Sequence, residues 1–354
     1  MRIKAAILAS NIEFMSRLSK IFQQKYPDKI ELAMFTNEDT LYQNLKTAHM
    51  DVILFDQSIK IKKEMIPDGV IAGYLSDISD VEEIEGLPAV CKYQRVEAIY
   101  KRIAGLYAEG TSDVKLKKSE GDIKIVLFTS VQGGSGTSTV AAAYALRRAE
   151  EKNRVFYLNL EKFGDCGLYF SGEGKLSFSD IIFALKSRKG NLLMKIESVA
   201  ECDPSGVEFF HSCRNAYDMF ELTDEEIRLL IQGISQTGKY KELVIDISGE
   251  LTERMVMLMK DYAQKIIYVA DGGDTATGNG KFERFCEAAR VLEQRQGGDI
   301  LGKTRLLYNR YSAKLSEPIK TSAVLVLGGI NRFQGVDGKG LVREVAGTEL
   351  LGTI

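Results

Sequence analysis

Short apolar runs and amphipathic stretches alternate along the first third of the chain. The apolar runs predict strands: KAAILAS, IELAMF, DVILFD, GVIAGYLS and PAVCKY. The amphipathic stretches predict helices: IEFMSRLSKIFQQKY, NEDTLYQNLKTAHM and RVEAIYKRIAGLYAE. The first helix gathers its apolar side chains on one face, as a helix lying on a sheet does: Phe14, Leu18, Ile21 and Phe22. This alternation predicts an α/β fold, a doubly wound parallel sheet with helices on both faces.

The rest of the chain repeats the alternation. Its strands are predicted at IKIVLFTS, RVFYLNL, ELVIDIS, KIIYVA, TRLLYN and AVLVLGG. Several of these runs are apolar without interruption, which is typical of parallel strands buried on both faces. One helix is expected near residues 178–188. Four more are expected to begin at or near Ser138, Thr223, Leu251 and Asn279. The second part therefore predicts another mostly parallel sheet with helices on both faces.

A polar stretch separates the two parts. The sequence AEGTSDVKLKKSEGD, residues 108–122, is rich in Gly, Ser and Lys and has no apolar periodicity, so it is typical of a linker. We expect a first domain over residues 1–108, a linker over 109–121 and a second domain over 122–354.

Composition narrows the classes of function. The 354 residues are 45% hydrophobic and 27% charged, with a net charge of -2 and no long basic block, which argues against nucleic acid as a specific partner. No stretch reaches the ~18 apolar residues of a membrane span. The first apolar run is also too short for a signal peptide. The sequence therefore predicts a cytoplasmic protein without a transmembrane segment.

The five cysteines are scattered and form no C-x-x-C motif. Cys202, His211 and Cys213 lie close together in the sequence and could bind a metal ion. They lack the spacing of structural zinc sites, however, and reduced cysteines are the simpler interpretation.

A glycine-rich turn follows the first strand of the second part. It reads VQGGSGTSTVA, residues 131–141, and leads into a predicted helix. Three glycines allow backbone N–H groups to point inward as an anion nest, and the helix N-terminus adds its positive end. The usual phosphate loop is G-x-x-x-x-G-K-[ST], but here Val131 and Thr137 occupy the first glycine and the lysine positions. The alternative is a tight strand–helix connection that binds no ligand.

Two further strands end in polar residues that could meet this loop. Asp246 ends the apolar run ELVID, and Asn309 ends LLYN. Ligands of such sheets bind at the carboxyl edge, where loops converge. Asp246 is therefore expected beside Ser138, whose hydroxyl would hold Mg²⁺. The alternative for Asp246 is a carboxylate that only caps a turn.

These motifs resemble one family. GGSGTST, NLEKFGDCGLYF, VIDIS and YNRY stand in the order of the glycine loop, switch I, the Walker B strand with switch II, and the late-strand Asn of the deviant-Walker ATPases. The second part is thus similar to the P-loop NTPase-like MinD/ParA group. It most resembles the CpaE/TadZ branch, the assembly proteins of tight-adherence (Flp) pili, in which a receiver-like domain precedes the ATPase domain.

The resemblance implies a set of ligands and roles. It implies ATP and Mg²⁺ as cofactors, Mg²⁺ on Ser138 and Asp246, and Glu161 as the residue that positions the attacking water. The late-strand positions Asn309 and Arg310 would lie at the ATP. The loop residues implied to bind ATP are Gln132, Gly133, Gly134, Ser135, Gly136, Thr137, Ser138 and Thr139.

The loop departs from the family pattern in its charges. Gln132 and Thr137 replace the two lysines of the group, and phosphoryl transfer depends on neutralising developing charge. We therefore expect ATP binding with weak hydrolysis at best.

The first part is similar to a response-regulator receiver, with a flavodoxin-like fold. Asp56 matches the phospho-acceptor, and Ser76 and Lys92 match the two switch residues. Ser10 and Asn11 replace the acidic pair that would hold magnesium, so phosphorylation should be poor. This pattern predicts an atypical receiver with a degenerate site, kept for docking or dimerisation. Alternatively, Asp56 only caps its strand.

The resemblance implies a homodimeric scaffold that locates a pilus-assembly or type II/IV secretion-like machine. Its partners would be other assembly proteins, at a cell pole or at the inner face of the membrane, with at most peripheral attachment. The C-terminal helix is expected to pack on its own domain, since its polar face is not basic. Dimer contacts are expected from switch I, at Phe163, Leu168, Tyr169 and Phe170. The alternative, above all for Leu168 and Phe170, is that these side chains lie in the core of their own domain. The alternatives are an active MinD/ParA-type switch that positions another cargo, and a metabolic ligase on the same fold.

Overall fold

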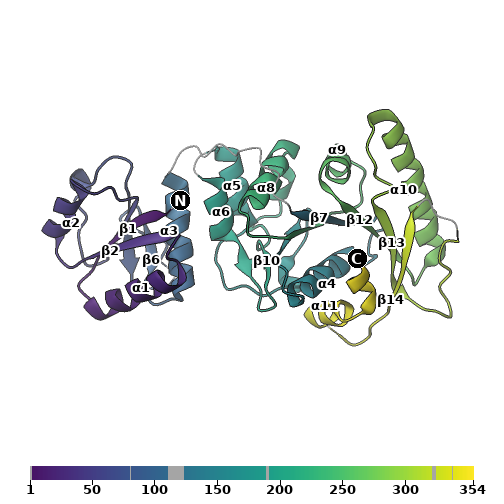
Figure 1. The fold of residues 1–354 in the computed structure, drawn as a ribbon, viewed down its shortest axis with the longest axis horizontal. Coiled ribbons are helices and arrows are strands. Elements are labelled where there is room, and N and C mark those ends of the chain that lie inside the picture. Colours follow the sequence, from purple (N-terminus) through teal and green to yellow (C-terminus); the bar gives the residue numbers. More distant parts are fainter. Residues whose placement is uncertain (1, 80, 111–122, 189–190, 321–323, 337) are drawn as a thin grey trace. The chain divides into compact units, whose positions relative to one another are not determined.

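The computed structural model describes residues 2–79, 81–110, 123–188, 191–320, 324–336 and 338–354. The chain divides into two compact units (Figure 1): residues 1–117 with 183–199, and residues 118–182 with 200–354. Most of the expected linker lies outside the described residues, and the domain boundaries drawn from the sequence stay predictions.

The first unit is built on a six-stranded sheet in the order β2-β1-β3-β4-β6-β5. All strand pairs are parallel except the short β5 against β6, which confirms the expected doubly wound sheet. The strands are β1 (Ile3–Leu8), β2 (Ile30–Phe35), β3 (Val52–Asp56), β4 (Ile71–Ser76), β5 (Glu83–Ile84) and β6 (Leu87–Cys91). The helices are α1 (Ile12–Lys25), α2 (Glu38–Leu45), the 3₁₀ turn η1 (Lys63–Met65) and α3 (Val96–Gly110).

Alternate residues of β1 enter two separate cores, as the period of a strand requires. Ile3, Ala5 and Ile7 pack with α1 and α3, whereas Ala6 and Leu8 pack with α2. On α1 the expected apolar face is rotated slightly. Met15, Leu18 and Phe22 are buried, while Phe14 and Ile21 are only half-buried, because Met15 also fits the i, i+3, i+7 spacing that faces the sheet.

One helix of the first unit comes from later in the chain. Helix α6 (Leu192–Val199) packs against α3. The backbone N–H of Asn191 donates to the Ala108 carbonyl (2.8 Å), and Met194 packs against the core formed by α1 and α3. Lys29 forms an ion pair with Glu197 at 2.9 Å.

The second unit contains an eight-stranded sheet in the order β14-β13-β12-β7-β11-β8-β10-β9. Its pairs are parallel except that of β10 with β9, which confirms a mostly parallel sheet. The predicted strands are β7 (Lys124–Thr129), β8 (Val155–Asn159), β11 (Glu242–Asp246), β12 (Lys265–Asp271), β13 (Thr304–Tyr311) and β14 (Leu325–Asn331). Two short strands extend one edge: β9 (Glu201–Cys202) and β10 (Val207–Phe209).

Helices cover both faces of this sheet, with α4 and α11 on one side and α8 and α9 on the other (Figure 1). The longer helices are α4 (Thr137–Glu150), α8 (Asp224–Gln236), α10 (Thr275–Gln296) and α11 (Gly338–Ala346). Helix α5 (Phe178–Ser187) begins in this unit, and its residues from Phe183 onward belong to the first unit. The short helices are η2 (Cys166–Leu168), α7 (Asp218–Glu221), α9 (Glu253–Met257) with the π turn η3 (Leu258–Tyr262), and η4 (Glu349–Thr353). The expected helix near 178–188 is confirmed. Helix α10 begins earlier than expected because the Asp274 side chain caps it, accepting from the backbone N–H of Thr277.

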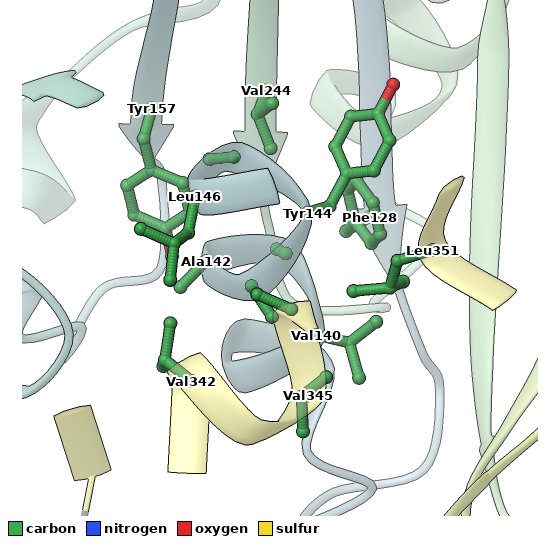
Figure 2. Packing of buried hydrophobic residues seen from close by; sticks show 14 of the residues in the cluster. Phe128, Val140, Ala142, Tyr144, Leu146, Tyr157, Val244, Val342, Val345 and Leu351 are labelled. Carbon is green, nitrogen blue, oxygen red and sulfur yellow. The ribbon is translucent and has the colours of Figure 1, made fainter. Parts of the chain in front are cut away.

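The alanine-rich helix α4 lies at the centre of the second unit. Figure 2 shows α4 between sheet residues such as Phe128 and Val244 and the C-terminal helix α11, with Val342 and Val345 facing α4. Ala142 and its neighbouring alanines are fully buried. The C-terminal helix therefore packs on its own unit, as expected from the sequence.

A buried carboxylate ties α4 to the amino end of the sheet. Glu242 accepts from the Tyr144 hydroxyl (3.0 Å) and from Arg148 Nη2 (2.8 Å), and Lys124 Nζ lies 3.4 Å away. Burial by itself would raise the pKa of Glu242, but Arg148 and Lys124 outweigh it and hold that pKa below its usual value.

Glu242→Gln is expected to lower the free energy of unfolding by about 3 kcal/mol at neutral pH, because it leaves two cations without their buried carboxylate. The folded pKa lies below the unfolded value of 4.5. The stabilisation is thus present above that value and is lost as the pH falls through the folded pKa. Urea unfolding at about pH 7 and about pH 4 measures both effects.

Asp261→Asn is the matched control, since it breaks an exposed pair with Arg228 at 3.3 Å and should cost less than about 1 kcal/mol. Equal losses in the two variants, or a Glu242→Gln loss that does not change with pH, would contradict the assigned role of Glu242.

Candidate functional site

The glycine-rich loop joins β7 to α4 at the carboxyl edge of the second sheet, where β7 lies between β11 and β12. Gly134 (φ 73°) and Gly136 (φ 82°) adopt the left-handed conformation, which only glycine enters readily. Gly136 is the N-cap residue of α4. The first turn of a helix leaves N–H groups without intrahelical partners, so they are available to an anion.

A cavity of about 270 Å³ opens over this loop. Besides the loop from Gln132 to Thr139, its walls include Glu161, Tyr169 and Ser248. The structure thus brings together, around one cavity, the loop and the switch I carboxylate that the sequence placed in one site.

Asp246 ends β11, is fully buried and does not line the cavity over the loop. Its Oδ2 accepts from the Tyr157 hydroxyl (2.8 Å), whereas its Oδ1 has no hydrogen-bond partner among the described residues. Burial, and then the charge of Glu161, raise the pKa of Asp246 to about 7, although the hydrogen bond from Tyr157 and the nearby Ser138 hydroxyl lower it. The Ser138 hydroxyl donates to Glu161 Oε2 at 3.2 Å.

This arrangement fits a magnesium ion. Mg²⁺ prefers oxygen ligands and is held by one or two carboxylates, while waters and phosphates complete its octahedron. The unpaired oxygen of Asp246 and the Ser138 hydroxyl are such ligands. No group of three or more His, Cys, Asp or Glu side chains that could hold a metal occurs in the described part of the chain. The alternative cluster of Cys202, His211 and Cys213 is therefore not found there.

Switch I follows β8. Asn159 accepts from the backbone N–H of Glu161 (2.8 Å), and Glu161 in turn reaches Ser138. In this arrangement Glu161 contacts a predicted metal ligand, and the role of Glu161 at an attacking water stays a prediction.

Tyr169 also lines the cavity, although the sequence indicated it only as a dimer contact. Burial, and then the charges of Asp246 and Glu161, raise the pKa of Tyr169 to about 12.

The two positions that lack a lysine are engaged locally. The Thr137 hydroxyl lies 2.9 Å from the Ser135 hydroxyl, within the loop. Gln132 Oε1 accepts from the backbone N–H of Asp271 (3.3 Å), within the same chain.

Asn309 and Arg310 reach the loop at its carbonyl oxygens. Asn309 Nδ2 donates to the Ser135 carbonyl (2.9 Å) and Arg310 Nη2 donates to the Gly134 carbonyl (2.7 Å). Their assigned contacts with ATP stay predictions.

Two residues of the site escaped the sequence reasoning. A Cβ on Gly249 would lie 2.0 Å from the Ser130 carbonyl oxygen, so the segment after β11 packs directly on the start of the loop. Asp271 pairs with Arg310 (2.9 Å). The available signal for Asp271 was the same as for Asp246, an aspartate that ends an apolar strand, in KIIYVAD.

The receiver-like positions of the first unit form a closed ionic network. Asp56 is buried; its Oδ2 accepts from Lys92 Nζ (2.7 Å) and its Oδ1 from the Ser58 hydroxyl (2.7 Å). Lys92 also contacts Asp77 at 2.8 Å. Burial would raise the pKa of Asp56, but Lys92 and Ser58 outweigh it and hold the pKa below its usual value.

The neighbouring positions are also engaged in local contacts. Ser76 bonds to the backbone of Ile78 at 3.0 Å, and Asn11 accepts from the backbone N–H of Phe14, capping α1. Asp56 also accepts from the backbone N–H of Ser58 (3.1 Å). These contacts fit a structural role for Asp56 and a degenerate phospho-acceptor site.

Comparison with solved structures identifies the fold of the second part of the chain. A ParA family ATPase from Chlorobium tepidum TLS is 16% identical with a TM-score of 0.52, and the match covers 66% of this chain and 96% of that chain. A plasmid partition protein from Borrelia burgdorferi (15% identity, TM-score 0.44) matches 65% of this chain and 99% of its own. The septum site-determining protein MinD from Pyrococcus horikoshii, complexed with Mg-ADP, matches 63% and 94% (17% identity, TM-score 0.46).

No curated protein matches the chain. Residues 1–108 match the family model of the TadZ-like receiver domain. The first part of the chain is therefore similar to the TadZ-like receiver domain, and it precedes a unit with the fold of the ParA family ATPases.

Proposed function

We propose that the second unit binds ATP with Mg²⁺ and uses the nucleotide mainly to hold an assembled state. The observation that carries this proposal is the lysine-free anion nest at the start of α4, whose Ser138 lies beside Asp246, a buried carboxylate with one unpaired oxygen. Backbone groups of residues 133–139 would bind the phosphates. Ser138 and Asp246 would bind Mg²⁺, which neutralises phosphate charge when bound.

Hydrolysis should be slow because the site lacks the charges that phosphoryl transfer needs. Thr137 and Gln132 are neutral, and both are engaged in contacts within the chain. Glu161 keeps a carboxylate at the cavity, so residual turnover is compatible with the site.

An exposed aromatic cluster beside switch I supports a homodimer. Phe163 is 81% exposed, and its ring lies 5.6 Å from that of Phe220, which in turn lies 6.1 Å from Tyr217. Lys162 Nζ lies 4.8 Å from the Phe220 ring. A large exposed apolar patch is typical of an interaction site. Leu168 is also exposed, whereas Phe170 is buried in the core and is not available for such a contact.

The TadZ-like receiver domain supports a scaffold that places a tight-adherence pilus or a related secretion machine, with other assembly proteins as partners. Its position would be cytoplasmic, at a cell pole or at the inner face of the membrane. No helix in the described ranges is long and apolar enough to cross a bilayer. The alternative is an active MinD/ParA-type ATPase that positions another cargo, and turnover separates the two.

The first experiment tests binding. Gly136→Ala should weaken ATP–Mg²⁺ binding at least tenfold, about 1.4 kcal/mol, in isothermal titration calorimetry. The added Cβ would lie 2.3 Å from Asn309 Nδ2, on a residue with φ 82°. Gly280→Ala on α10, outside the loop, is the matched control, because a Cβ there also meets nothing within 4 Å. If both variants bind ATP as the wild type does, the nest is not the binding site.

The second experiment measures phosphate release. Wild-type turnover should stay below ~1 s⁻¹, the low end of typical enzymes. Thr137→Lys should raise it by up to about 10²-fold, by restoring a charge-stabilising donor. Thr137→Gln has similar bulk without the charge and should change turnover little. Fast wild-type turnover would favour the active ATPase instead.

The third experiment concerns assembly. With saturating ATP–Mg²⁺, the wild type should be a dimer by light scattering at tens of micromolar protein. Phe163→Glu should weaken the dimer at least tenfold, because a charge would be buried at the contact. Leu315→Glu, at an 84% exposed position of the same unit, should leave it intact. A monomeric wild type would refute the dimer.

A further inference from the structure

Strand β13 loses its regular register next to the glycine-rich loop. Its pairing with β14 shifts between Tyr308 and Tyr311, and Arg310 lies at φ 58°. A residue with a Cβ rarely adopts this left-handed conformation, which costs energy and occurs mostly at functional sites. A register shift can redirect side chains, as a β-bulge does. Here the irregularity coincides with the two side chains that reach the loop, Asn309 and Arg310.

Both side chains hold carbonyl groups of the loop. Arg310 Nη2 lies 2.7 Å from the Gly134 carbonyl oxygen, and Asn309 Nδ2 lies 2.9 Å from that of Ser135. In a planar trans peptide, the C=O of one residue and the N–H of the next point in opposite directions. Fixing these two carbonyls therefore fixes the N–H directions of Ser135 and Gly136, which belong to the nest.

Asp271, at the end of β12, holds Arg310 in turn. Its Oδ1 lies 3.2 Å from Arg310 Nε and its Oδ2 lies 2.9 Å from Nη2, the forked contact that a guanidinium makes with a carboxylate. The backbone N–H of Asp271 also donates to Gln132 Oε1, at the start of the loop (3.3 Å). Asp271 is thus linked to the loop at Gln132 directly and at Gly134 through Arg310.

We propose that Arg310 is a positioning residue, held by Asp271, that keeps the lysine-free loop in its anion-binding shape before the nucleotide arrives. This inference rests on the proposed binding of ATP. Without a lysine to attract the phosphates, affinity depends more strongly on N–H groups that are already oriented. Because Asp271 pairs with the guanidinium, the contribution of Arg310 is to the geometry of the loop rather than to its charge.

The test compares Arg310→Ala with Arg305→Ala. Arg305 lies on the same strand but bonds to the Gly302 carbonyl (2.7 Å), away from the loop. In the nucleotide-free protein, Arg310→Ala should speed hydrogen exchange at residues 133–139. Its affinity for ATP–Mg²⁺ should fall about 10–100-fold, the range for a hydrogen bond from a charged group. Arg305→Ala should change neither measurement.

Two further variants separate the effect of the geometry of the Arg310 side chain from the effect of its charge. Arg310→Lys keeps the charge but not the forked contact, and should lose most of the affinity that Arg310→Ala loses. Asp271→Ala should resemble Arg310→Ala, and the double variant should be no weaker than either single one, because both act through one contact. Full affinity in Arg310→Lys would overturn the positioning role. If Arg310→Ala fails to fold, the lysine variant alone decides the matter.

The outcomes also separate this inference from the proposed function. A wild type that binds no ATP would refute the proposed function. Amide hydrogen exchange at residues 133–139 would still test the positioning role of Arg310 in that case. If Arg310→Ala loses affinity for ATP–Mg²⁺ but hydrogen exchange at residues 133–139 is unchanged, Arg310 contacts the nucleotide directly, and the inference is wrong. Unchanged affinity and exchange in Arg310→Ala, with an ATP-binding wild type, would overturn the inference alone.

Discussion

The second unit depends on the close approach of helix α4 to its sheet. Small side chains such as Ala142 let the helix backbone lie near the strands, and α11 closes the other side with Val342 and Val345. This packing fixes the first turn of α4 above the carboxyl edge, so that Ser138 meets Glu161 from switch I. A shift of α4 would separate these groups, because close-packed interiors transmit small displacements.

The two ends of strand β11 show how one strand serves stability and chemistry separately. Glu242 at its amino end is fully engaged by Arg148 and Tyr144, and its pKa lies below the usual value. Asp246 at its carboxyl end is fully buried but has one oxygen without a partner among the described residues, and its pKa rises to about 7. A buried, ionised carboxylate with an unpaired oxygen favours a cation beside it. Functional sites commonly retain unfavourable features of this kind, here the burial of a carboxylate without a full set of partners.

Much of the fold followed from the sequence, because uninterrupted apolar runs bounded by glycine and polar residues leave few options for strands. The loop and Asp246 were also foreseeable, since each follows a predicted strand. The roles of Asn309 and Arg310 at the loop carbonyls were not, because they depend on a register shift in β13 that has no local sequence signature. Gly249 was missed for a similar reason, since its requirement comes from Ser130, far away in the sequence.

The division of the chain affects the order in which the protein can fold during synthesis. Domains usually fold as they emerge, the N-terminal one first. Here the first unit includes residues 183–199, and α6 covers part of α3. The receiver-like sheet can form early, but its last helix leaves the ribosome only after β7, α4 and β8 of the second unit. The packing of α6 on α3 therefore has to wait until the first elements of the second unit have been synthesised.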